Sequence, residues 1–142
     1  MTLMIIFSSV CVILFFYGIV ILCLQHRGNN IKKDIWDKQG YTTTNQISTL
    51  YVDNTRKCFY VIGCMRVYSF SDIKDFKIVT NQNKPTTVNY IAVYIYVNDI
   101  NCPLVKMVLL TTETSMNSMV YRSNMDIAEQ INALLMYIKN EN

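Results

Sequence analysis

The chain has almost no histidine and little glycine or proline. Of its 142 residues, one is histidine (His26), four are glycine and two are proline. Beyond His26 there is no imidazole to activate a serine or cysteine nucleophile, and the scattered glycines form no phosphate-binding loop. Cys58, Cys64 and Cys102 lack the close-paired spacing of a metal centre. The sequence therefore predicts a protein that is not an enzyme and has no cofactor, metal or small-molecule substrate.

Charge is absent from the N-terminal part of the chain. No charged residue occurs from Leu3 to Leu24, and all 13 Lys and Arg and all 10 Asp and Glu residues follow Leu24. As a helix rising about 1.5 Å per residue, this run exceeds the roughly 30 Å of a bilayer's hydrocarbon core. A cleaved signal peptide would need a basic start, a shorter apolar run and small residues at a cleavage site. We therefore expect a transmembrane anchor over residues 1–25, held in the lipid bilayer through residues 3–24.

Basic residues flank only the C-terminal side of this run. Arg27, Lys32 and Lys33 follow it, and an excess of Lys and Arg marks the cytoplasmic side of a span. Three cysteines outside the run cannot all pair, which favours a reducing compartment. We expect a single-pass protein of the inner (cytoplasmic) membrane, with its N-terminus outside and its C-terminal domain in the cytoplasm. An exported domain with a Cys58–Cys64 disulfide is the alternative.

The same basic residues are candidates for lipid headgroup contact. Arg27, Lys32 and Lys33 lie in a predicted juxtamembrane linker over residues 26–45, where each basic residue near anionic lipid contributes about 1 kcal/mol. Arg56 and Lys57, at a predicted hairpin tip, are further candidates, with a solvated tip as the alternative. No basic stripe is interleaved with aromatic residues, so we expect no nucleic acid partner.

Residues 46–140 carry the pattern of one small α+β domain. Six segments rich in β-branched and aromatic residues are predicted as antiparallel strands: 50–52, 58–62, 65–70, 73–80, 90–97 and 104–111. Segment 81–87, which contains Pro85, is predicted as a loop.

A helical period replaces the strand pattern near the C-terminus. Apolar residues recur at helical spacing at Ile127, Ile131, Leu134 and Ile138. Ser123 and Asp126 resemble a capping box, which would start the helix there; a start near Ser118 is the alternative. The expected fold is a strongly bent antiparallel sheet or barrel of six to seven strands, closed by this amphipathic helix.

The strand over 90–97 alternates most clearly. Its core side is predicted to carry Ile91, Val93, Ile95 and Val97. Its other side carries Tyr90, Tyr94 and Tyr96, a residue type enriched in protein interfaces. We interpret these tyrosines as a candidate surface for a protein partner. The alternatives are that the linker covers them or that they are simply half-exposed strand residues.

The order of these segments resembles bacterial pleckstrin-homology-like domains. That order is a span, a linker, the hairpin with Leu50-Tyr51-Val52-Asp53, the segment from Tyr68 to Phe76, two long strands and a closing helix. The resemblance itself covers roughly Gln46 to Lys139. Its most specific piece is Phe70-Ser71-Asp72-Ile73. The chain is similar in particular to small single-span membrane-anchored forms of bacterial and prophage genomes, some of them associated with exclusion of superinfecting phage.

The resemblance implies a pleckstrin-homology-like domain and provides no catalytic residues. The function expected from it is a non-enzymatic, membrane-tethered interaction module at the cytoplasmic face, with prophage-encoded superinfection exclusion as the candidate process. An anionic-lipid-sensing domain at the membrane surface is the alternative.

Overall fold

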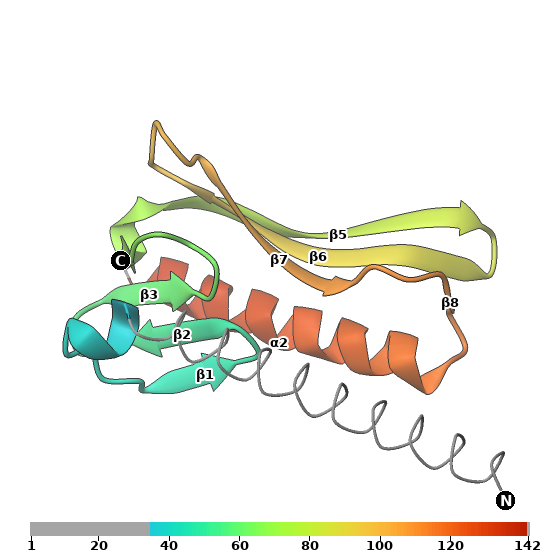
Figure 1. The fold of residues 1–142 in the computed structure, drawn as a ribbon, viewed down its shortest axis with the longest axis horizontal. Coiled ribbons are helices and arrows are strands. Elements are labelled where there is room, and N and C mark those ends of the chain that lie inside the picture. Colours follow the sequence, from blue (N-terminus) through green and yellow to red (C-terminus); the bar gives the residue numbers. More distant parts are fainter. Residues whose placement is uncertain (1–34, 142) are drawn as a thin grey trace, which may run out of the picture. The chain divides into compact units, whose positions relative to one another are not determined.

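A computed structural model describes residues 35–141 of the chain (Figure 1). The chain divides into two compact units, residues 1–39 and 40–142, and a short helical segment covers residues 35–38 of the first. No helix within residues 35–141 is both long and apolar enough to cross a membrane. The anchor predicted over residues 3–24 lies outside the described residues, as do Arg27, Lys32 and Lys33.

The second unit begins with a small antiparallel sheet. Its order is β1 (Asn45–Ile47), β2 (Leu50–Asp53), β3 (Cys58–Val61) and β4 (Tyr68–Ser69). The predicted hairpin is confirmed as β2 and β3, which pair from Leu50 opposite Val61 to Asp53 opposite Cys58. The turn between them places Lys57 at a φ of 54°.

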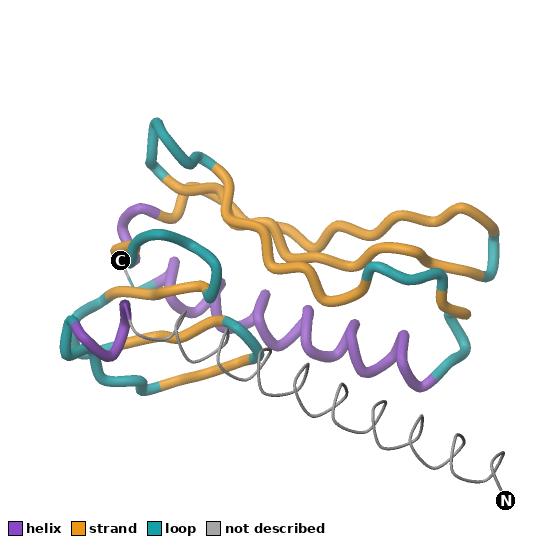
Figure 2. Tube along the Cα trace, viewed as in Figure 1, coloured by secondary structure: helices purple, strands orange, loops and turns teal. Residues whose placement is uncertain are grey.

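A second antiparallel sheet follows, with much longer strands (Figure 2). Its order is β5 (Ile73–Lys84), β6 (Thr87–Val97) and β7 (Leu104–Leu110), and the short β8 (Thr114–Ser115) also pairs with β6. The loop predicted over 81–87 is wrong, because only Pro85 and Thr86 separate β5 from β6. Proline fixes φ near the value that a tight turn needs, and register shifts around Gln82 let both strands continue to that turn.

The C-terminal helix α2 (Met119–Asn140) begins earlier than the capping-box pattern predicts. Ser118 is its N-cap, and the Ser118 hydroxyl accepts a hydrogen bond of 3.1 Å from the backbone N–H of Tyr121. The start at Ser123 is therefore wrong and the alternative start near Ser118 is confirmed. The predicted apolar stripe is also confirmed, since Ile131 and Ile138 are fully buried, while Ile127 and Leu134 pack against the core.

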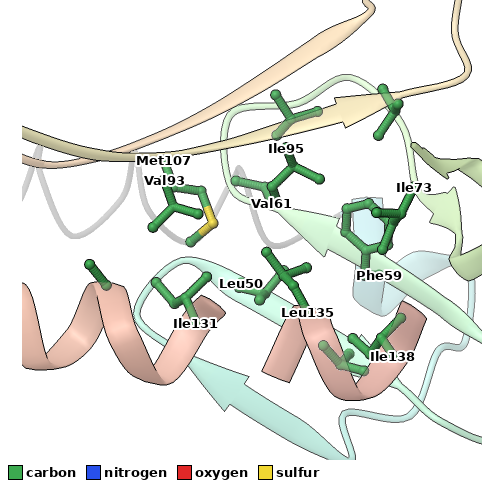
Figure 3. Packing of buried hydrophobic residues seen from close by; sticks show 14 of the residues in the cluster. Leu50, Phe59, Val61, Ile73, Val93, Ile95, Met107, Ile131, Leu135 and Ile138 are labelled. Carbon is green, nitrogen blue, oxygen red and sulfur yellow. The ribbon is translucent and has the colours of Figure 1, made fainter. Parts of the chain in front are cut away.

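The hydrophobic core lies where α2 meets both sheets (Figure 3). The helix contributes Ala128, Ile131, Leu135 and Ile138. The predicted core side of β6 is confirmed, because Ile91, Val93, Ile95 and Val97 are all buried. The first sheet adds Leu50, Phe59 and Val61 from its paired strands.

The predicted α+β class, with antiparallel strands followed by a helix, is confirmed, but the single bent sheet or barrel of six to seven strands is wrong. The strands form two separate sheets, and between them the chain passes through a short 3-10 helix, η1 (Phe70–Asp72). The strand predicted over 65–70 shrinks to β4, and Met65 is 95% exposed. The reason is local, because the Asp72 carboxylate accepts a hydrogen bond of 2.9 Å from the Ser69 N–H and thereby stabilises a turn in place of a longer strand.

Candidate interaction surface

Tyr90, Tyr94 and Tyr96 lie together on the side of β6 that faces away from α2. The alternation along the strand puts them opposite the buried Ile91, Val93 and Ile95, and all three tyrosines are half-buried. The Tyr90 and Tyr94 hydroxyls are 3.3 Å apart and hydrogen-bonded. The structure therefore brings the three predicted residues to one surface.

Two lysines from the neighbouring strands complete this surface. Lys77 of β5 and Lys106 of β7 both stand opposite Tyr94 in the register. The Lys106 ammonium lies 5.4 Å from the centre of the Tyr94 ring, and the Lys77 ammonium lies 5.5 Å from the centre of the Tyr96 ring. These are cation–π distances. We call the five residues Tyr90, Tyr94, Tyr96, Lys77 and Lys106 the tyrosine face.

The tyrosine face combines aromatic area with exposed positive charge. Both lysines are exposed, and Ala92, between Tyr90 and Tyr94 on the strand, is fully buried. The hydrogen bond with Tyr94, together with partial burial, raises the pKa of Tyr90 to about 12. The Tyr90 phenol is therefore neutral at physiological pH, and the face carries the charge of its two lysines.

A pocket of about 570 Å³ adjoins the tyrosine face at the start of β7. One wall is residues 62–66, between β3 and β4, and the other is the β6–β7 turn with Leu104, Val105 and Lys106. Lys106 belongs both to the tyrosine face and to the pocket wall. The volume falls within the range of small-ligand or side-chain sites, roughly 300–1,000 Å³.

An ion pair with a buried carboxylate forms one side of this pocket. Asp99 is only 9% exposed, and its carboxylate forms an ion pair with the Arg66 guanidinium at 3.2 Å and accepts a hydrogen bond from the Asn101 N–H at 2.9 Å. The guanidinium carbon of Arg66 also lies 4.9 Å from the centre of the Tyr68 ring. Because Arg66 and Asp99 neutralise each other, this pair adds no net charge to the pocket wall.

Two free thiols, those of Cys64 and Cys102, line the same pocket. Burial, and to a smaller extent the neighbouring Cys102, raises the pKa of Cys64 to about 11. Burial raises the pKa of Tyr68 as well, and so does a hydrogen bond between its hydroxyl and Cys102. A thiol of pKa about 11 is protonated at neutral pH and is a weak nucleophile. The Cys64 thiol therefore suits binding better than covalent chemistry.

The predicted lipid contacts Arg56 and Lys57 lie elsewhere, in the β2–β3 turn of the first sheet. The Lys57 ammonium is 3.0 Å from the Glu141 carboxylate, just beyond α2, and the Arg56 guanidinium carbon is 5.1 Å from the centre of the Tyr41 ring. Both side chains have partners within the domain, so neither is an uncommitted charge.

The pocket and the lysines of the tyrosine face were missed from the sequence. The signal for Lys77 and Lys106 was present in part, because both occupy polar positions on strands next to the tyrosine strand. The pocket had no signal, since Arg66 and Asp99 are far apart in the chain and meet only through the fold.

No protein-family model, curated protein or solved structure matches this chain.

Proposed function

We propose that this protein is a non-enzymatic interaction module, tethered by residues 3–24 at the cytoplasmic face of the inner membrane, whose pleckstrin-homology-like domain binds a protein partner. The observation that carries the proposal is the tyrosine face. Tyrosine offers large contact area at low entropic cost, and aromatic residues are enriched at protein interfaces.

Charge indicates what kind of partner this surface favours. Lys77 and Lys106 are exposed and held over tyrosine rings, whereas the Asp75 carboxylate, opposite Tyr96 in the register, lies 3.8 Å from Lys139. Complementary potentials increase association rates and exclude wrong partners. We therefore propose an acidic protein surface as the partner. The candidate process is exclusion of superinfecting phage, which rests on the family resemblance alone.

The test is site-specific photo-crosslinking of the full chain in cells. A crosslinking residue at Asn81, which stands opposite Tyr90 at the end of the tyrosine face, should yield one protein adduct, to be identified by mass spectrometry. Tyr94→Ala with Tyr96→Ala should reduce the affinity of that purified protein about tenfold, because aromatic anchors dominate interface energy. Tyr137→Ala, at an exposed tyrosine of α2, is the matched control and should bind normally.

Two further results decide the rest of the proposal. Removing residues 3–24 should release the chain from membranes and abolish its function in cells. Full function in the soluble fragment would contradict the tether.

The lipid-sensing alternative is tested by vesicle flotation of residues 40–142, shown to be folded by circular dichroism. If this fragment floats with vesicles only when anionic lipid is present, and Arg56→Ala with Lys57→Ala prevents flotation, the lipid-sensing alternative replaces the protein partner.

A further inference from the structure

The β7 strand has an open edge beside the pocket. In the second sheet β7 pairs with β6 on one side, and among the described residues no strand pairs with its other side. The side chain of Val108 on this strand is 47% exposed. An exposed edge of this kind can accept another extended chain by backbone hydrogen bonding.

The register identifies the backbone groups at this edge. The Val97 N–H donates to the Pro103 carbonyl at 3.0 Å, so the neighbouring pair, Tyr96 and Leu104, exchanges no hydrogen bonds. Antiparallel strands alternate, so Leu104, Lys106 and Val108 direct their N–H and C=O groups away from β6. The position of the Cys102 thiol is consistent with an outward-pointing Leu104 carbonyl, because the thiol lies 3.8 Å from that carbonyl oxygen.

The outward groups of Lys106 and Val108 are therefore available. Within the part of the chain that is described, no backbone hydrogen bond from another strand or turn reaches either residue on this side. The pocket opens at the same edge, with Ile62, Leu104 and Val105 among its apolar lining. An added strand would thus meet backbone partners along β7 and a cavity for one side chain at the start of β7.

Charge indicates which kind of chain can bind at this edge, a second copy of β7 or a segment of another protein. A second copy of β7 would bring Lys106 toward another Lys106, and like charges on paired strands are destabilising. An acidic segment would instead bring a carboxylate to Lys106, which is exposed on the outer side of the edge. The positive charge here favours a different, acidic chain.

We propose that the β7 edge and its pocket bind an extended acidic segment of a partner protein, which adds as a strand beside Lys106 and Val108 and inserts one large apolar side chain next to Ile62, Leu104 and Val105. This inference rests on the proposed function, because it specifies how the protein partner is held. The tyrosine face would contact the same partner, since Lys106 belongs to both surfaces.

The test uses random short peptides, selected by phage display on the full-length chain in lipid nanodiscs. The selected sequences should be acidic with an apolar residue at alternate positions. Val108→Pro removes an outward N–H but no β6–β7 hydrogen bond, and proline is tolerated on edge strands. It should weaken peptide binding about tenfold, whereas Val108→Thr, which keeps the N–H, should change it less than about twofold.

A second measurement needs no variant and guards against misfolding of Val108→Pro. Cys102 is exposed at the pocket, and bound peptide should protect it from iodoacetamide, as read by mass spectrometry of that one cysteine. Failure to select any peptide, or peptides that bind folded Val108→Pro normally and leave Cys102 reactive, would overturn the proposal. So would a chain that forms dimers through this edge and binds no peptide.

The two proposals can fail separately. If Val108→Pro keeps the crosslink at Asn81 while Tyr94→Ala with Tyr96→Ala loses it, the edge proposal is wrong and the proposed function stands. If neither variant changes the crosslink, both are wrong.

Discussion

At the scale of single residues, Asp53 shows how one buried carboxylate holds a turn. It is 1% exposed, and its oxygens accept hydrogen bonds from the backbone N–H groups of Thr42 at 2.9 Å and of Thr55 and Arg56 at 3.0 Å each. Burial acts to raise the pKa of Asp53, but these hydrogen bonds and the charge of Arg56 outweigh it and hold the pKa below its ordinary value of 3.8.

We expect Asp53→Asn to lower the free energy of unfolding by about 1–3 kcal/mol at neutral pH, because the amide NH₂ replaces an acceptor that backbone donors need. The lowered pKa in the folded state also means that the carboxylate stabilises the fold above about pH 4 and that this stabilisation is lost as pH falls through the lowered value. Urea midpoints measured from pH 6 downward should therefore fall more steeply below about pH 4 for the original chain than for the variant.

The control for this prediction is Asp126→Asn, at an exposed carboxylate on α2. It should leave both the stability and its acid dependence nearly unchanged. Equal behaviour of the two variants would mean that the Asp53 hydrogen bonds contribute nothing measurable.

At the scale of elements, α2 and the β5–β6 hairpin both depend on how a segment ends. The helix starts at its Ser118 cap, about one turn before the Ser123 pattern, and the hairpin closes over Pro85 and Thr86. In both cases the regular hydrogen bonding continues further than polar residues in the sequence suggest. End signals from short polar residues are ambiguous, because the same side chains occur inside an exposed helix turn or strand.

We expect Ser118→Ala to destabilise the protein by about 1 kcal/mol, since the Tyr121 N–H would lose its side-chain acceptor. Ser123→Ala is the matched variant. Ser123 is an exposed interior residue of α2, where alanine is the better helix former, so its substitution should be neutral or slightly stabilising. Urea denaturation of both variants checks this, and a larger loss at Ser123 would contradict the observed start of the helix.

At the scale of the domain over residues 40–142, the helix α2 is what unites the two sheets. It contacts β5, β6 and β7 of the second sheet and β1 of the first. Leu135 is completely buried in the shared core, and Figure 3 shows it between residues of both sheets. The domain therefore depends on this helix for the burial of both apolar sheet faces.

We expect Leu135→Ala to lower the free energy of unfolding by about 2–5 kcal/mol, the range for a buried leucine that leaves a cavity. Both sheets should unfold in one transition, so far-ultraviolet and near-ultraviolet circular dichroism should give the same urea midpoint. Met136→Ala, at a half-exposed neighbour on the helix, should cost far less. Similar losses at the two positions, or two separate transitions, would contradict a shared core.

Periodicity explains which features could be predicted. The alternation in β6 and the apolar stripe of α2 directly reflect which side of each element faces the core. Residue order alone therefore predicted the core residues Ile91, Val93 and Ile131 and placed the three tyrosines on one side of β6. The short β1 and β8 were missed because strands of two or three residues have too few positions to show a period.

The sequence by itself determined the order of the longer strands and the helix, the inward sides of β6 and α2, and the grouping of Tyr90, Tyr94 and Tyr96, because these depend on neighbours within one element. Tertiary structure alone decided that the strands form two sheets, that Lys77 and Lys106 stand over the tyrosines, and that Arg66 meets Asp99 at a pocket. Those features depend on register and on contacts between segments far apart in the chain, and local patterns carry no information about which distant residues meet.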